Sequence, residues 1–179
     1  MAEQKSTLTA IQQKFVLHWG EMGAKWGINR TVAQIHALLY LSDRPLHAED
    51  IATTLGVARS NVSNSLRELH GWGIVKVTHI LGDRRDHFES MKDVWEMFRI
   101  IVDERKKREA DPTLATLREA VAETRKPGAA DAYTRERLAD MLQFFELMTT
   151  WCEQTRKLPT PAIIRMVKMG NKLARILGE

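Results

Sequence analysis

The chain of 179 residues has one cysteine and no long apolar run, and these two absences exclude whole classes of protein. A single cysteine cannot form an intramolecular disulfide framework or a cysteine-based zinc cluster. No apolar run approaches the ~20 residues that a helix needs to cross a bilayer. The first residues, Met1 to Ser6, do not have the pattern of a secretory signal peptide. We therefore expect a cytoplasmic protein.

The patterns that accompany catalysis and metal binding are also missing from the sequence. The six histidines show no metal-ligand spacing, and there is no glycine-rich phosphate loop or nucleophile elbow. Cys152 lies in an apolar helical pattern, where it is interpreted as an inert core residue, with a redox sensor as the alternative. The sequence predicts no enzyme, no cofactor and no metal site.

The composition of the sequence is typical of a globular protein, with slightly more basic than acidic residues. The residues are 44% hydrophobic and the formal net charge is +4, and the length suits one domain or one domain with an extension. Residues 156–179 hold six Lys and Arg against one Glu, a net charge of +5. This basic segment has three interpretations: a solvated face beside a dimer interface, a contact with DNA phosphates, or a membrane-surface helix. We do not expect a membrane partner.

Apolar residues recur at steps of three and four along most of the chain, which predicts a mainly helical protein. The predicted helices cover residues 8–26, 29–42, 51–55, 58–69, 90–105, 111–121, 134–156 and 160–177. The expected caps are Asn29 for the second helix, Ser90 for the fifth and Thr160 for the last. One apolar face is expected to point inward: Val94, Trp95, Phe98, Ile101 and Val102. The apolar faces of the first and the C-terminal helices are expected to be buried between the helices of two subunits: Leu8, Ile11, Phe15, Trp19, Met22 and Trp26; Leu138, Met141, Leu142, Phe145, Met148 and Cys152; and Ile163, Val167, Gly170, Ala174 and Leu177.

Between residues 74 and 90 the pattern changes from helical to alternating. Residues 74–80 and 87–90 are predicted strands around the charged turn 82–86, which together make a β-hairpin. The predicted fold class is mainly α with a small β-hairpin wing, a winged helix-turn-helix flanked by N- and C-terminal dimerisation helices. The predicted domains are a dimerisation helix (1–28), a DNA-binding domain (29–110) and a C-terminal helical dimerisation region (111–179).

The helix that begins near Ala58 has the surface that DNA recognition requires. Its inward residues are apolar: Val62, Leu66 and Leu69. Its outward residues are Arg59, Ser60, Asn61, Ser63, Asn64 and Arg67. Asn pairs with adenine, Arg pairs with guanine and Ser bonds phosphate or base in a major groove about 12 Å wide. The alternative is an ordinary solvated helix face, and the hairpin that follows favours DNA.

Three segments resemble the MarR-type transcriptional regulators and are closer to their GbsR-like branch. These are Ile51–Leu69, the junction Gly71-Trp-Gly-Ile-Val75 and the turn Gly82-Asp-Arg-Arg-Asp86, followed by the helix Val94–Arg105. The resemblance implies a homodimer that binds a near-palindromic operator in double-stranded DNA, as a ligand-responsive repressor.

The resemblance also implies roles for the turn between the strands. Arg85 would enter the minor groove, Asp83 would orient Arg85, and Arg84 would add charge. A solvated hairpin tip is the alternative for both arginines. In many relatives a Ser or Thr caps each of the supporting and recognition helices. This chain differs, because it has His47 and Ala58 at those two positions.

The five tryptophans introduce a candidate effector site. GbsR-like regulators include sensors of choline, and aromatic rings bind quaternary ammonium groups through cation–π attraction. The resemblance implies such a site at Trp19, Trp26, Tyr40, Trp95 and Phe98. The alternative is that these residues belong to the core and the dimer interface.

A second function remains open for the whole chain. Residues 47–90 hold five basic against six acidic residues, a net charge of −1. This balance favours a winged-helix protein-interaction module without DNA binding. If the protein does bind DNA, the placement of its charges must attract the DNA, because the bulk charge of this region does not.

Overall fold

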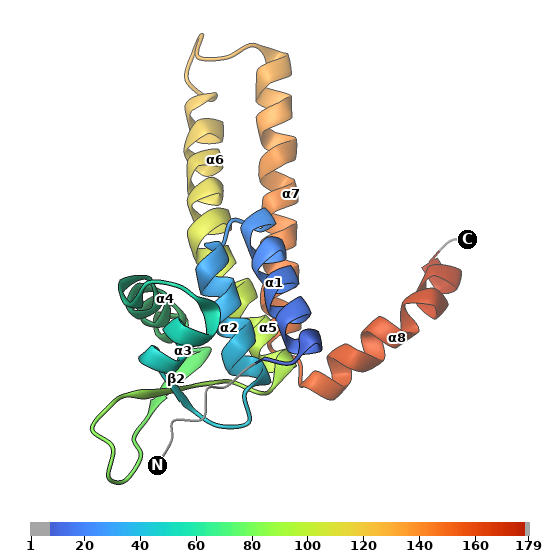
Figure 1. Cartoon of the computed structure of the whole chain (residues 1–179). Helices are drawn as coiled ribbons and strands as arrows, with labels where there is room; N and C mark the ends of the chain where they lie inside the picture. Colours follow the sequence, from blue (N-terminus) through green and yellow to red (C-terminus); the bar gives the residue numbers. More distant parts are fainter. Residues whose placement is uncertain (1–7, 178–179) are drawn as a thin grey trace. The chain divides into compact units, whose positions relative to one another are not determined.

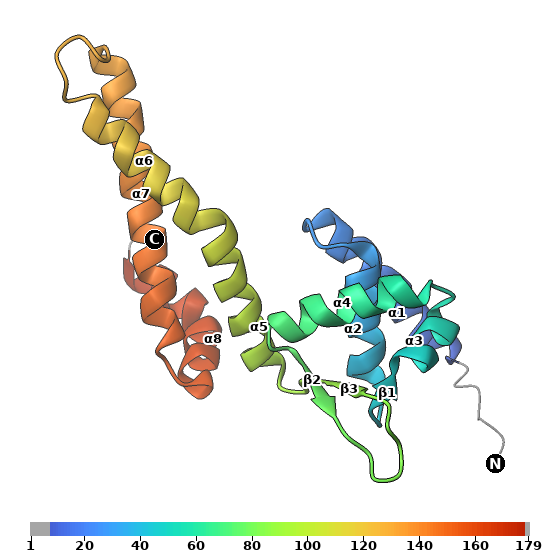
Figure 2. The same ribbon diagram turned by 90° about the vertical axis from the view of Figure 1, so that its left-hand side faces the viewer.

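The computed structural model describes residues 8–177, with side chains up to residue 169. The chain forms two compact units that divide between Ile100 and Ile101. Figures 1 and 2 show the elements of each unit from two directions. The predicted absence of a signal peptide concerns residues outside the described range. Within that range, no helix has the length and hydropathy that crossing a bilayer requires.

The first unit is a helical module with a small antiparallel sheet. Its helices are α1 (Ala10–Lys25), α2 (Arg30–Leu41), α3 (Ala48–Leu55) and α4 (Arg59–Gly71), and α5 (Val94–Arg105) begins in it. Its strands are β1 (Leu46–His47), β2 (Val75–Thr78) and β3 (His87–Ser90), in the order β1-β3-β2. The order of three helices, hairpin and helix confirms the predicted fold class.

The core of this unit lies around α2, which packs against α1, α3 and α4. Ile35 and Leu39 of α2 are fully buried together with Ile51, Val62 and Leu69. These residues recur on one face of each helix, as the apolar spacing predicted. The buried face of α4 therefore fixes which of its faces points outward.

Local side-chain bonds explain where the helices begin and end. The Asn29 carboxamide accepts from the Thr31 N–H at 2.8 Å, which confirms the predicted cap of α2. At the first departure from the family pattern, His47 Nδ1 accepts from the Asp50 N–H at 3.2 Å and caps α3. Gly56 ends α3 with a φ of 65°, a left-handed conformation that favours glycine. Ala58, the second departure, starts α4 without a side-chain cap.

Two details of the wing differ from the prediction. The sheet has a third strand, β1, whose Leu46 and His47 pair with Phe88 and His87 of β3. Two residues are too short to show an alternating pattern in the sequence. The cap of α5 is Asp93, whose carboxylate accepts from the Trp95 and Glu96 N–H groups, and Ser90 lies at the end of β3 instead.

Within this chain the first helix packs through small residues, and part of its predicted apolar stripe stays exposed. Val16, Gly20 and Gly23 are its buried residues, whereas Ile11 and Trp26 of the predicted stripe are exposed. A Cβ atom on Gly23 would lie 2.5 Å from the Ala33 Cβ, so glycine is needed for the close approach to α2. Because α1 packs on α2, it belongs to the first unit structurally, and its role in dimerisation stays a prediction.

The second unit is built from long helices. From α5 the chain continues through a π-helical turn, η1 (Lys106–Ala110), into α6 (Asp111–Glu123) without a break. The helices α7 (Ala132–Arg156) and α8 (Thr160–Leu177) follow. Figures 1 and 2 show α6 and α7 side by side, and the Arg118–Glu146 (3.0 Å) and Lys106–Glu153 (3.4 Å) ion pairs accompany their packing.

Several residues of the predicted apolar faces are exposed in the chain. In α5, Met97 is buried, whereas Val94, Trp95 and Phe98 are exposed. In α7, Leu138, Leu142, Phe145 and Cys152 are half-buried, but Met141 and Met148 are exposed. In α8, Ile163 is half-buried and Val167 is exposed, and the side chains of Gly170, Ala174 and Leu177 lie outside the described part. Helical spacing identifies the apolar face of each helix. It does not tell whether that face is buried within this chain.

Candidate nucleic-acid interface

The outward face of α4 carries the predicted DNA-binding side chains. Arg59, Ser60, Asn61, Asn64 and Arg67 are exposed, and Ser63 is half-buried. The opposite face of the helix is buried through Val62, Ser65, Leu66 and Leu69. The polar face is thus fixed in direction by the core, and its polar groups can reach a partner without unfolding the helix.

Polar groups on this face are paired with one another and with α3. Arg59 Nε donates to Glu49 Oε2 at 3.0 Å, and Arg59 Nη1 donates to Ser63 Oγ at 2.6 Å. Arg67 Nη1 donates to Asn64 Oδ1 at 3.1 Å, which orients the Asn64 carboxamide. Glu49 was not a predicted site residue. It precedes Arg59 by ten positions, and only the turn between α3 and α4 brings the two side chains together.

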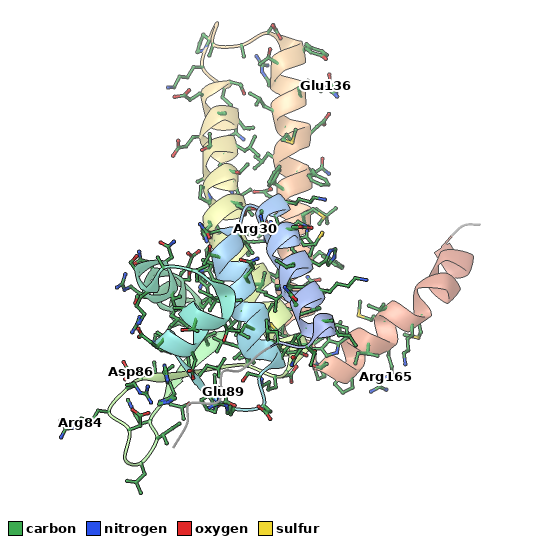
Figure 3. The ribbon with its side chains drawn as sticks, in the orientation of Figure 1. Arg30, Arg84, Asp86, Glu89, Glu136 and Arg165 are labelled. Atoms are coloured by element: carbon green, nitrogen blue, oxygen red, sulfur yellow. The ribbon has the colours of Figure 1, made fainter. Side chains whose placement is uncertain are left out.

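The wing loop between β2 and β3 holds a tight acid–arginine pair. Arg85 Nη2 donates to Asp83 Oδ2 at 2.7 Å, Arg85 Nε contacts both carboxylate oxygens at 3.0 Å, and the Arg85 N–H donates to Oδ1 at 2.9 Å. These bonds hold the pKa of the Asp83 carboxyl well below its usual range. Figure 3 shows Arg84 on the outer side of the loop, pointing away from it.

A hollow of about 430 Å³ lies between α4 and the wing. It brings together four of the predicted residues, Arg59, Ser63, Arg67 and Arg85. Apolar side chains in its lining are Leu66, Val77 and Phe88, and the acids Glu49 and Asp86 also line it. The α4 helix and the wing loop therefore share one concave surface lined by arginines, although they are separated in the sequence.

Two of the aromatic residues predicted as an effector site, Trp19 and Tyr40, contact different side chains of the protein. Trp19 stacks on Phe15 with ring centroids 5.4 Å apart, and Tyr40 lies 6.5 Å from the His36 ring. The Lys92 ammonium sits 5.7 Å from the centroid of the Tyr40 ring. A cation of the protein itself thus occupies the position that a ligand cation would need over Tyr40.

These features define a winged helix: a buried helical scaffold, an outward polar helix after a short turn, and a hairpin whose loop presents arginines. Residues 26–86 match the model of the MarR family. The winged-helix region is therefore similar to transcriptional regulators of the MarR family.

The chain is also similar to a curated protein and, in its fold, to a solved structure. The chain is 24% identical over 98 residues to YvaV of Bacillus subtilis (strain 168), which is assigned as an HTH-type transcriptional regulator. The match covers 53% of this chain and 55% of that protein, so it spans about half the length of the curated relative. The fold is similar to the crystal structure of a transcriptional regulator, with a TM-score of 0.59 and 20% identity over 82% of this chain and 95% of that one.

Proposed function

We propose that the protein is a sequence-specific DNA-binding repressor that binds a near-palindromic operator as a homodimer. The observation that carries this proposal is the outward face of α4. Six side chains able to bond bases or phosphates lie on one helix whose other face is buried. An ordinary solvated helix face would not also adjoin an arginine-lined hollow and a wing.

The proposal assigns two grooves to two elements. Arg59, Ser60, Asn61, Ser63, Asn64 and Arg67 of α4 contact bases or phosphates in the major groove. Arg84 and Arg85 of the wing loop engage the adjacent minor groove, where inserted arginines are favoured by its negative potential. Because residues 47–90 have a net charge of −1, their attraction to DNA depends on the positions of these arginines and not on the total charge.

Dimerisation is the second part of the proposal. The α7 helix exposes Phe144, Leu147 and Trp151, at exposed fractions of 56%, 68% and 54%. An exposed apolar surface of this kind is typical of a protein interface. A second copy packed through the terminal helices would place two recognition helices about one DNA turn, ~34 Å, apart.

The finer assignments depend on the sequence resemblance alone. We propose that the chain belongs to the GbsR-like branch, that it acts in the cytoplasm with the DNA, and that a small molecule changes the separation of the recognition helices. A quaternary ammonium effector such as choline stays a prediction, and the Lys92–Tyr40 contact does not favour it.

A salt series tests DNA binding. Fluorescence anisotropy would measure Kd for the DNA upstream of the protein's own gene and for an unrelated duplex of equal length. We expect a preference for the first duplex and a slope of log K against log salt of about −0.9 for each phosphate contacted. An absence of binding at low salt would contradict the proposal and favour the protein-interaction module.

A further inference from the structure

We propose that Glu49 is a positioning residue of the recognition surface, which holds the Arg59 guanidinium in one orientation and thereby raises the preference for operator over other DNA. This inference rests on the proposed function. It adds to the DNA-binding surface an acidic residue that contacts no base or phosphate itself.

Two helices hold Arg59. Its Nε donates to Glu49 Oε2 of α3 at 3.0 Å, and its Nη1 donates to Ser63 Oγ of α4 at 2.6 Å. A guanidinium has five N–H donors in a rigid plane, so two bonds at different nitrogens fix that plane and leave donors for a partner. Ordering a long side chain before binding removes part of the entropy cost of association.

The wing contains the same arrangement. Arg85 is held through its Nε by Asp83, as Arg59 is held by Glu49, and both arginines line the hollow between α4 and the wing. Arg84 differs: no ion pair with a described acidic residue is found for it. The surface therefore has two acid-anchored arginines that face one hollow, whereas Arg67 is held by the Asn64 carboxamide and Arg84 is not anchored by an acid in this way.

Glu49 has a second effect that an experiment must separate from positioning. Its carboxylate is exposed, so it repels every DNA duplex alike through its charge. Removing the charge raises the affinity for operator and non-operator DNA together. Losing the anchor lowers the ratio of the two affinities. The ratio is thus the quantity that reports positioning.

Two substitutions at one position separate these effects. Glu49→Gln removes the charge, whereas Glu49→Asp keeps the charge on a side chain one methylene shorter, which withdraws it from Arg59. Anisotropy titrations would measure Kd for an operator fragment and for a non-operator duplex at one salt concentration. We expect the affinity ratio to fall roughly 3- to 10-fold in Glu49→Asp, since the Arg59 side chain must then be ordered on binding. The fall should be smaller in Glu49→Gln, because its amide oxygen can still accept from Arg59 Nε.

Glu89→Gln is the matched control, because it removes one acid that pairs with Lys76 on the wing strands, away from Arg59. It should leave the ratio unchanged. A normal ratio in Glu49→Asp, or an equal fall in Glu89→Gln, would overturn the inference. In an Arg59→Ala background, Glu49→Asp should have no further effect on the ratio, and a further fall would also overturn it.

A measurement without DNA keeps this inference distinct from the proposed function. In ¹⁵N NMR spectra of the full chain, the Arg59 Nε–H signal should shift and exchange faster with water in Glu49→Asp, whose shorter side chain withdraws the carboxylate, than in the unchanged protein. An unchanged signal would overturn the Glu49 anchor whatever the DNA results. If the anchor is present but the unchanged protein prefers no DNA sequence, the proposed function fails instead.

Discussion

The two units of the chain use their apolar side chains in opposite ways. The first unit buries Ile35, Leu39 and Ile51 in a closed core, whereas in residues 101–169 the buried apolar residue is Leu114. Large apolar side chains of α7, such as Phe144 and Trp151, stay exposed. The first unit therefore has a closed apolar core of its own. The second leaves apolar side chains exposed, as the dimer that we propose requires.

The largest effect should come from truncating a core residue of the first unit. Leu39→Ala should cost about 2–5 kcal/mol in the free energy of unfolding, because it removes buried contacts and leaves a cavity. Leu147→Ala on the exposed face of α7 is the matched control and should change monomer stability by less than about 0.5 kcal/mol. Denaturant unfolding at low protein concentration measures both. An equal loss of stability in the two variants would contradict the difference in burial between the two units.

The first unit should also determine how stability depends on pH. Burial, assisted by the charge of Lys92, lowers the pKa of His36 from 6.5 to about 4. The unfolded chain then binds one more proton than the folded chain between these values, so stability falls as pH falls from 6.5 to 4. The expected loss is roughly 3 kcal/mol, at 1.36 kcal/mol per pKa unit.

His36→Leu should remove this dependence. It also removes a buried imidazole nitrogen, Nε2, for which the described residues offer no hydrogen-bond partner. Urea unfolding at pH 7 and pH 4.5 would measure it. The exposed His79 offers the control: His79→Leu should keep the dependence of the unchanged protein. A His36→Leu protein that loses as much stability on acidification would refute this explanation.

The exposed face of α7 should matter for association rather than for folding. Trp151→Ala should weaken the dimer by roughly 2 kcal/mol or about 30-fold in Kd, because tryptophan is typical of the residues that dominate interfaces. Sedimentation equilibrium measures this constant. Gln143→Ala, on another exposed part of the same helix, should leave it unchanged. If Trp151→Ala dimerises normally, this face is not the interface.

The wing should make the smallest of these contributions. Arg85→Ala should weaken operator binding about tenfold and reduce the salt slope by about 1, since one cation near a phosphate is lost. Asp83→Asn should have a partial effect in the same direction because it leaves Arg85 in place but loosens it. Anisotropy titrations at several salt concentrations test this. Unchanged binding by Arg85→Ala would remove the wing from the interface.

The sequence predicted what local chemistry determines. The core face of α4 and the cap at Asn29 each follow from side chains within a few residues, and the structure has both. It did not predict β1 or the Glu49–Arg59 bond. Those depend on which segments meet in three dimensions, and short-range periodicity contains no such information.

We propose that the exposed apolar surface of the second unit joins two copies of the chain, so that two winged helices bind one two-fold DNA site. Sequencing the fragments of its own genome that the protein retains tests this proposal. We expect fragments that share an inverted repeat, with half-sites about 10 base pairs apart from centre to centre. Retained fragments with no common sequence, or with a single unpaired half-site, would contradict it.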